Sequence, residues 1–321
     1  MDEEMRGWCR NLIDAGRLEP DEQVLVMVDE PLVVQGAQLA DAVKQVGGRP
    51  RLELWTGPKR PLKHAPSGVI EGAREATLCI FLAQDPIGDE AAARFEVLET
   101  LVEHGGRELY LALITPELLE GELSQPQPNV AEPARRLLAE LEGSKEIHIR
   151  GRAGTDLRLR VDGRPWLTDA LPLKAGGGHN FPGGEVFVAP LADGADGVLV
   201  ADLTIPYTVD GLVDAPVTLR FERGRVVSIE GGRAAQMLRE LVADAGEGAD
   251  VIAELGIGLH PGLAPRGHTM LDEKAAHTAH VAIGRNTGSY GGDNEAAIHV
   301  DCIFSEPQVE ADGRPVDLPY A

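Results

Sequence analysis

The sequence predicts two domains of different class. The first, residues 1–145, is an α/β domain with a mostly parallel sheet, and the second, residues 146–321, is an α+β domain rich in antiparallel strands. With 321 residues, the chain is longer than one average domain. Short apolar runs alternate with amphipathic stretches in the first half, whereas short alternating strands divided by glycine turns follow after about residue 145.

The first half contains four apolar runs of strand length separated by helical segments. The expected strands are 23–29, 51–55, 76–83 and 109–114, and the expected helices are 32–46 and 91–104. Strands that alternate with helices are typical of βαβ units and therefore of a parallel sheet. No GxGxxG or GxxxxGK[ST] pattern follows any of these strands, so no motif supports nucleotide binding. We expect this domain to serve as a scaffold or lid.

A helical connection, residues 116–145, leads into the second half. There the segments EIHIRG, TDLRLRVDGRPW, GEVFVAP, GVLVADLTI, VTLRFERGRVVSIEGG and HVAIG each alternate apolar and polar residues. Alternation with glycine turns between the runs is typical of antiparallel strands. A helix at 233–245 interrupts them.

Charge and cysteine content narrow the function classes. The chain has 30 basic and 52 acidic residues, a net charge of −22, which repels phosphate backbones and anionic lipids. We therefore expect neither nucleic acid nor membrane as a partner. The first 16 residues lack the apolar core of a signal peptide, and no window reaches the about 18 apolar residues of a membrane span. Three cysteines without paired spacing fit a reducing, cytoplasmic location.

Two glutamates of the second half lie in apolar surroundings. Glu185 begins an apolar strand after a Pro-Gly-Gly turn, where a carboxylate is costly unless a cation compensates it. A water-exposed glutamate at the strand edge is the alternative. Glu254 lies within the run VIAELGI, where a solvent-facing glutamate is harder to justify. Gly256 and Gly258 follow it and allow close backbone approach.

Histidines and an aspartate complete a candidate metal-ligand set. His299 and Asp301 are two apart in the strand AIHVDCIF, so both side chains emerge on the face opposite Val300. Nitrogen and oxygen ligands without thiolates suit zinc, manganese, cobalt or iron(II). A core histidine satisfied by the aspartate is the alternative. Of His277 and His280, we expect only His280 to point inward, because it adjoins an apolar run.

The roles of other polar residues near these segments are not decided by the sequence. Asp272, Glu273 and Lys274 either support the ligands or form a solvated charged turn. We expect His260 to be a hydrogen-bonded loop histidine, whereas His179 either approaches the substrate or is an ordinary solvated loop histidine.

Several segments of the second half resemble the M29 aminopeptidases, the aminopeptidase T or thermophilic metalloprotease family. The matching segments, in family order and over about half of the chain, are GTDLRLRVDGRPW, NFPGGEVFVAP, IAELGIGLHPG, LDEKAAHTAHVAIGRNTGSYGG and IHVDCIF. The resemblance implies an α/β domain joined to an α+β domain, and a homodimer. It also implies two divalent ions (Zn, Co or Mn) held by Glu185, Glu254, His280, His299 and Asp301.

The resemblance further implies a metal-dependent aminopeptidase that hydrolyses N-terminal peptide bonds with an activated water. Glu254 and Glu185 would relay protons. The family places a catalytic tyrosine where this chain has Thr287, and Tyr290, three residues on, is the candidate replacement.

Two other functions stay open. The 2,5-dihydroxypyridine dioxygenases also resemble this family and use one iron with two histidines and one carboxylate. In that alternative the chain is a ring-cleaving dioxygenase that binds Fe(II) through His299, Asp301 and either His280 or Glu254. A non-enzymatic binding role is the third possibility, and the intact five-residue set argues against it.

Overall fold

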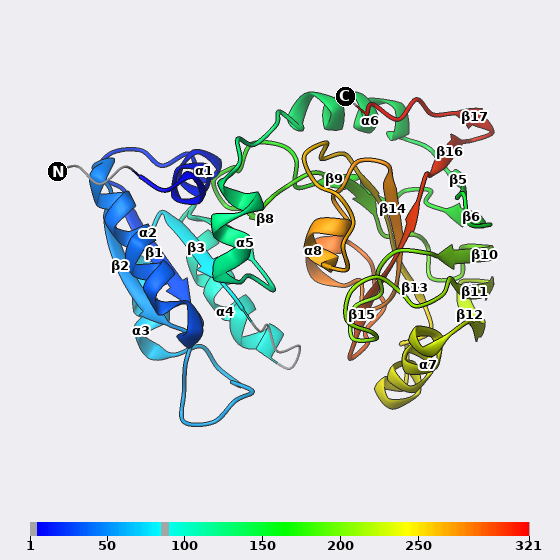
Figure 1. The fold of residues 1–321 in the computed structure, drawn as a ribbon, viewed down its shortest axis with the longest axis horizontal. Helices are drawn as coiled ribbons and strands as arrows, with labels where there is room; N and C mark the ends of the chain where they lie inside the picture. The colour runs from blue at the N-terminus through cyan, green and yellow to red at the C-terminus, as the bar shows by residue number, and fades with distance from the viewer. Residues whose placement is uncertain (1–4, 85–89, 321) are drawn as a thin grey trace. The chain divides into compact units, whose positions relative to one another are not determined.

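The computed structural model describes residues 5–84 and 90–320 and divides into two compact units (Figure 1). The first comprises Met1–Gln127 with Pro172–Gly183, and the second comprises Pro128–Leu171 with Gly184–Ala321. The domain boundary expected at residue 145 falls inside the second unit. Helix α6 (Ala131–Leu141) buries Ala134, Leu137 and Leu141 in the core of that unit, which explains why it groups there.

The first unit is built around a parallel five-stranded sheet of order β2-β1-β3-β4-β8. Its strands are β1 (Gln23–Val28), β2 (Arg49–Leu54), β3 (Leu78–Leu82), β4 (Arg107–Leu111) and β8 (Gly178–Asn180). Its helices are α1 (Gly7–Gly16), α2 (Val33–Gln45), α3 (Ser67–Glu75), α4 (Ala91–Val102) and α5 (Pro116–Glu120), with short 3-10 turns at Glu30–Leu32 and Glu122–Ser124.

Helices cover both faces of this sheet (Figure 1). Gly36 of α2 lies against Val28, whereas Gly72 of α3 lies against Leu25 on the opposite face of the same strand. Side chains of α3 and α4 join Leu25, Met27 and other residues of that second face in one apolar cluster. Because both faces are covered, the strands read as nearly continuous apolar runs, which is the pattern seen in the sequence.

The second unit contains two antiparallel sheets. The seven-stranded sheet has the order β12-β11-β10-β6-β5-β16-β17, and the five-stranded sheet has the order β15-β14-β13-β9-β7. The strands of the larger sheet are β5 (Glu146–Arg150), β6 (Asp156–Arg160), β10 (Ala195–Ala201), β11 (Val217–Glu222), β12 (Arg225–Glu230), β16 (Gln308–Ala311) and β17 (Arg314–Pro315). Those of the smaller are β7 (Leu167–Thr168), β9 (Glu185–Val188), β13 (Ile252–Gly258), β14 (Thr278–Gly284) and β15 (His299–Ser305).

One apolar core joins the two sheets of this unit to helices α6 and α7 (Arg233–Ala245). It contains Leu157 and Leu219 from the larger sheet and Leu255 and Val281 from the smaller one. The smaller sheet therefore turns one face to this core, and its other face is free to carry polar groups.

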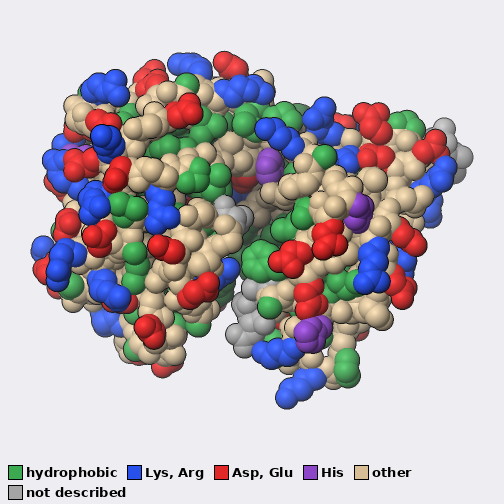
Figure 2. All heavy atoms as spheres, turned by 180° about the vertical axis from the view of Figure 1, so that it is seen from behind, with side chains coloured by type: hydrophobic (Ala, Val, Ile, Leu, Met, Phe, Trp, Pro, Cys, Tyr) green, Lys and Arg blue, Asp and Glu red, His purple; other side chains and the backbone are tan. Residues whose placement is uncertain are grey.

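The predicted fold class is confirmed: the N-terminal sheet is parallel and the later sheets are antiparallel. The strand expected at 109–114 is misplaced, because β4 ends at Leu111 and Leu113 adopts a left-handed conformation (φ 56°) that an extended strand does not allow. Helices α1 and α3 were not expected. No helix in the described ranges has the length and apolar character that crossing a membrane requires. Acidic and basic side chains are interspersed over the face shown in Figure 2.

A buried carboxylate anchors the loop that follows β2. Glu90 is fully buried and accepts hydrogen bonds from the Trp55 indole (2.9 Å), the Arg60 guanidinium (2.9 Å) and the Leu62 amide (2.7 Å). Burial alone would raise its pKa, but these donors outweigh burial and lower the pKa to about 2.

We expect Glu90→Gln to lower the free energy of unfolding by about 1–3 kcal/mol at pH 7, because a charge-assisted network is lost. Since the folded pKa lies below the ordinary value of 4.5, this contribution is fully present above pH 4.5 and disappears as the pH falls through 2. Urea unfolding followed by tryptophan fluorescence measures it, with the exposed Glu103→Gln as control. Equal midpoints for the two variants at pH 7 would contradict the assignment.

Candidate metal centre

The five candidate ligands lie on four adjacent strands of the smaller antiparallel sheet. They are Glu185 on β9, Glu254 on β13, His280 on β14, and His299 and Asp301 on β15. The strand register places Ala282 opposite both Glu254 and Asp301, so these side chains share a face. Val300 lies on the other face in the apolar core, as the alternation of the sequence predicts.

Small residues make room for the ligands on this face. Gly256 is paired with His280, and the histidine ring lies across it. A Cβ atom at Gly256 would overlap the ring of His280. The glycine is therefore needed for steric reasons, because its φ angle is one that other residues also adopt.

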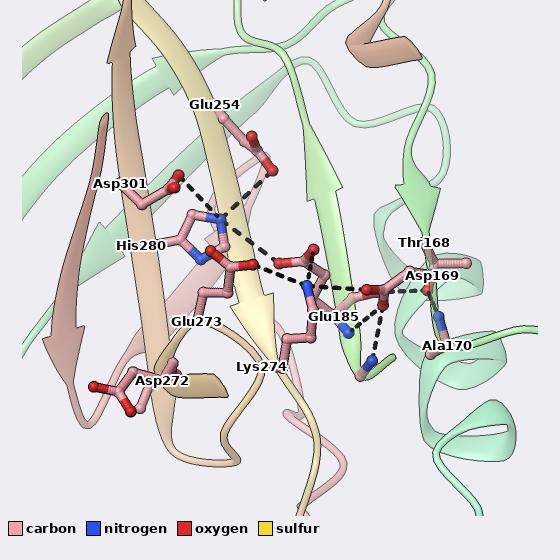
Figure 3. Close-up of polar contacts among 12 residues, drawn as sticks. Thr168, Asp169, Ala170, Glu185, Glu254, Asp272, Glu273, Lys274, His280 and Asp301 are labelled. Atoms are coloured by element: carbon pink, nitrogen blue, oxygen red, sulfur yellow. Dashed lines mark hydrogen bonds and ion pairs between the residues drawn. The ribbon is translucent and has the colours of Figure 1, made fainter. Parts of the chain in front are cut away.

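The ligands form two groups that share one residue. Glu185, Glu254 and His280 form the first group, and Glu254, His299 and Asp301 form the second. Within each group, one ligand atom per residue lies within 4.8 Å of the others. Figure 3 shows Glu185, Glu254 and Asp301 converging on the ring of His280.

Glu254 turns one oxygen towards each group. Its Oε1 lies 3.5 Å from His280 Nε2, and its Oε2 lies 3.2 Å from His299 Nε2. Asp301 Oδ1 lies 3.3 Å from the same nitrogen of His299. A carboxylate divided in this way is able to bridge two cations.

Buried oxygens at the site lack hydrogen-bond donors. Within the described residues, neither Glu185 Oε2 nor Glu254 Oε2 accepts a hydrogen bond although both are buried, and Glu254 Oε2 has only the ion pair with His299 Nε2. Such orphaned acceptors are costly in a protein interior. A bound cation would compensate both, so the residues present fit a metal. The exposed alternative for Glu185 is wrong, since only 5% of the residue is accessible.

A hydrogen bond fixes the orientation of His299. Its Nδ1 lies 2.6 Å from the carbonyl oxygen of Arg285. Because a carbonyl only accepts, Nδ1 must donate, and in the neutral ring Nε2 is left as the acceptor facing Glu254 and Asp301. Histidines that bind metals usually donate their other nitrogen in this manner.

The pKa values of the candidate ligands link metal binding at this site to the loss of protons. Burial on its own would lower the pKa of His280, but the hydrogen bond to Glu254 and the charges of Asp301 and Glu185 raise it to about 10. Burial would likewise raise the pKa of Asp301, and His299 outweighs it and lowers that pKa to about 2. A cation that binds here must displace the histidine protons, so its affinity rises with pH.

A buried lysine lies beside the first group. Lys274 is fully buried, and its Nζ contacts Glu185 Oε1 (2.7 Å), Asp169 Oδ2 (2.9 Å) and Glu273 Oε1 (3.0 Å), as Figure 3 shows. Asp272, also buried, accepts hydrogen bonds from the Thr204 hydroxyl and from three backbone amides. The solvated-turn alternative for residues 272–274 is therefore wrong.

Among the described residues, neither ligand group includes His277, His260 or His179. His277 packs against Tyr320, with ring centroids 4.1 Å apart. His260 is buried, and its Nδ1 accepts a hydrogen bond from the Gly262 amide. His179 belongs to β8 of the first unit.

Aromatic rings flank the second group. Tyr290, on a 3-10 turn at Gly288–Tyr290, stacks on His299 at 4.8 Å and meets Phe187 edge-on at 6.0 Å. Thr287 precedes that turn. Sequence reasoning missed Asp169, although it lies three residues after the segment GTDLRLRVDGRPW, and Phe187, whose place in an apolar strand gives no signal.

Comparison with known proteins identifies relatives of this unit. The family described as thermophilic metalloprotease (M29) matches residues 129–317. Aminopeptidase T from Thermus thermophilus is 31% identical over 189 residues, which cover 52% of this chain and 44% of the relative. Aminopeptidase AmpS from Bacillus subtilis is 28% identical over 186 residues, covering 51% and 44%. The chain thus spans less than half the length of these two relatives.

A second kind of relative matches more of the chain. The 2,5-dihydroxypyridine 5,6-dioxygenase from Pseudomonas putida is 28% identical over 229 residues, covering 66% of this chain and 63% of the relative. A solved structure of 2,5-dihydroxypyridine dioxygenase from the same organism has a TM-score of 0.76 at 20% identity, over 97% and 94% of the two chains. AmpT from Thermus thermophilus has a TM-score of 0.66 at 22% identity, over 96% and 99%. These two structures show that the fold is shared.

We expect Gly256→Ala to displace the His280 ring and to lower the free energy of unfolding by about 1–3 kcal/mol, the usual cost of overpacking. Zinc retained after dialysis should fall below that of the unchanged protein, because His280 leaves the first group. Elemental analysis and thermal unfolding measure the two effects. Gly177→Ala, at a position with room for a methyl group, is the control. Unchanged zinc uptake in Gly256→Ala would show that the ring does not need this position.

Proposed function

The chain belongs to the thermophilic metalloprotease (M29) family, and from this membership we propose that it is a metal-dependent aminopeptidase. In this proposal it hydrolyses N-terminal peptide bonds. The observation that carries it is the division of the five ligands into two groups that share Glu254. The aminopeptidase relatives support a peptide as substrate.

Each group would hold one divalent ion, zinc, cobalt or manganese. Glu185 and His280 would complete the first site, His299 and Asp301 the second, and Glu254 would bridge them. When bound, a pair of such ions lowers the pKa of a water molecule and polarises a carbonyl oxygen. The orphaned oxygens of Glu185 and Glu254 support this assignment.

The proposed proton carrier is an oxygen of Glu254 or Glu185 that holds no ion. Peptide hydrolysis moves one proton from water to the leaving amine, and a carboxylate can accept and then return it. Burial raises the pKa of Glu185 well above its ordinary value, against the opposing charge of Lys274. A carboxyl group with a raised pKa is suited to giving a proton back at neutral pH.

Tyr290 is the proposed hydrogen-bond donor. The charge of His299 would lower its pKa, but burial and the nearby Glu254 and Asp301 raise the pKa above its usual value. The phenol therefore keeps its proton and can donate a hydrogen bond to a developing negative charge. In this proposal Tyr290 takes the role of the family tyrosine that Thr287 replaces.

We also propose that the protein acts in the cytoplasm as a homodimer. The absence of paired cysteine spacing supports the compartment, and the family resemblance supports the dimer.

A ring-cleaving Fe(II) dioxygenase is the second candidate. It is favoured by the dioxygenase relative, whose match covers 66% of this chain against 52% for aminopeptidase T. His280, His299 and Asp301 could supply two histidines and one carboxylate to a single iron. The presence of both Glu185 and Glu254 favours the aminopeptidase, because a single iron of this type needs one carboxylate.

Metal content separates these candidates. We expect two zinc, manganese or cobalt ions per chain in protein purified without oxygen, measured by elemental analysis. Hydrolysis of leucine p-nitroanilide should accompany them. A single iron per chain, with turnover of 2,5-dihydroxypyridine under oxygen, would favour the dioxygenase instead. A protein that takes up no metal on reconstitution would refute both.

Removal of the shared ligand should affect both ions. We expect Glu254→Gln to weaken both sites and to lower kcat by about 10²–10⁴-fold, because a bridging ligand and proton carrier is lost. Asp301→Asn should weaken only one of the two ions, since Asp301 belongs to one group. Titration calorimetry with zinc measures the stoichiometry, with the exposed Glu240→Gln as control. One fully retained site in Glu254→Gln would argue against bridging.

A further inference from the structure

Lys274 is buried among more carboxylates than one ammonium group neutralises. Its Nζ contacts Asp169, Glu185 and Glu273 at 2.7–3.0 Å, and its own side chain is wholly inaccessible. When all four groups are ionised, they carry one positive and three negative charges. Buried charges are costly unless they are paired, so this arrangement calls for a reason beyond packing.

The backbone around Lys274 is fixed. Its amide donates to the Leu271 carbonyl at 3.2 Å, and its carbonyl accepts from the His260 amide at 2.8 Å. The backbone from which the ammonium group extends therefore has a defined position, in the turn after α8 (Thr269–Asp272).

The two carboxylate oxygens of Glu185 have different contacts, because Lys274 donates a hydrogen bond to only one of them. Oε1 accepts a hydrogen bond from Lys274 Nζ at 2.7 Å. Oε2 has no donor among the described residues and lies 3.7 Å from His280 Nε2. One oxygen is thus occupied, and the other is turned towards the partner ligands of the first group.

Asp169 ties the same lysine to the backbone of Glu185. Its Oδ1 accepts hydrogen bonds from the Gly184 amide (2.8 Å) and the Glu185 amide (3.0 Å), while its Oδ2 contacts Lys274 (2.9 Å). The Glu185 carbonyl accepts a further hydrogen bond from the Thr168 hydroxyl. Main chain and side chain of Glu185 are consequently held by one connected network (Figure 3).

We propose that Lys274 is a positioning residue that makes Glu185 bind metal through a single oxygen, Oε2, and thereby sets the affinity and coordination geometry of the first group. The inference rests on the proposed function, because it requires that the cluster binds metal. The competing explanation is that Lys274 only offsets negative charge. The two explanations predict different metal binding in a variant that keeps the net charge of the cluster but lacks the contact between Lys274 and Glu185.

The test uses cobalt(II), whose visible absorption reports coordination number, in the full-length protein. Three variants are compared with the unchanged protein: Lys274→Met, Glu273→Gln, and the double variant Lys274→Met/Glu273→Gln. The double variant loses one positive and one negative group, so it keeps the net charge of the cluster while it lacks the contact to Glu185. It also decides the matter if Lys274→Met alone does not fold, since it avoids the added negative charge.

We expect the double variant to bind the first-group ion about 10–100-fold more weakly, the usual effect of losing a residue that orients a ligand. Its cobalt absorption should weaken, because Glu185 becomes free to use both oxygens and the coordination number rises. Glu273→Gln should keep the spectrum of the unchanged protein, since Lys274 still contacts Glu185.

Two results overturn the proposal. In the first, the double variant has the spectrum and affinity of the unchanged protein, which means that charge balance alone matters. In the second, Glu273→Gln changes the spectrum as much as the double variant does. That result means that Lys274 does not act on the metal through its contact with Glu185. In both, cobalt still binds the unchanged protein, so the proposed function stands. Failure of the unchanged protein to bind cobalt removes the proposed function and this inference together.

Discussion

The free-energy cost of burying carboxylates on one face of the smaller sheet determines which residues surround the candidate metal centre in the second unit. Glu185 and Glu254 are almost inaccessible, and their side chains lie over strands whose opposite face belongs to the apolar core. An unpaired carboxylate in such a place is strongly unfavourable. The surrounding sequence is arranged to meet this cost: two histidines face the shared glutamate, and a buried lysine faces the other.

The same constraint explains the glycine and alanine content of these strands. Ligands from four neighbouring strands can approach one another only if the positions between them carry almost no side chain. Gly256 lies below His280, and Ala282 separates Glu254 from Asp301 across three strands. The site therefore depends on these small residues as well as on the ligands themselves. Because they carry no reactive group, a list of reactive side chains does not include them.

The sequence predicted the elements that local pattern determines. The strand β1, the helix α7 and the shared face of His299 and Asp301 follow from periodicity, which depends only on neighbouring residues. Asp169 was not predicted, and support of the ligands was only one of two alternatives for Lys274, because the contact between these residues joins segments about a hundred residues apart and leaves no periodic trace. The return of residues 172–183 to the first unit was missed for the same reason.

That return has a practical consequence for fragments of the protein. Strand β8 pairs with the outer side of β4, yet the chain first passes through 44 residues, 128–171, that belong to the other unit. A recombinant piece that stops before residue 172 would leave β4 as an uncovered edge, with unpaired amides and carbonyls open to association with other chains. Soluble expression of the first unit alone therefore calls for a permuted or spliced gene that carries β8 along with it.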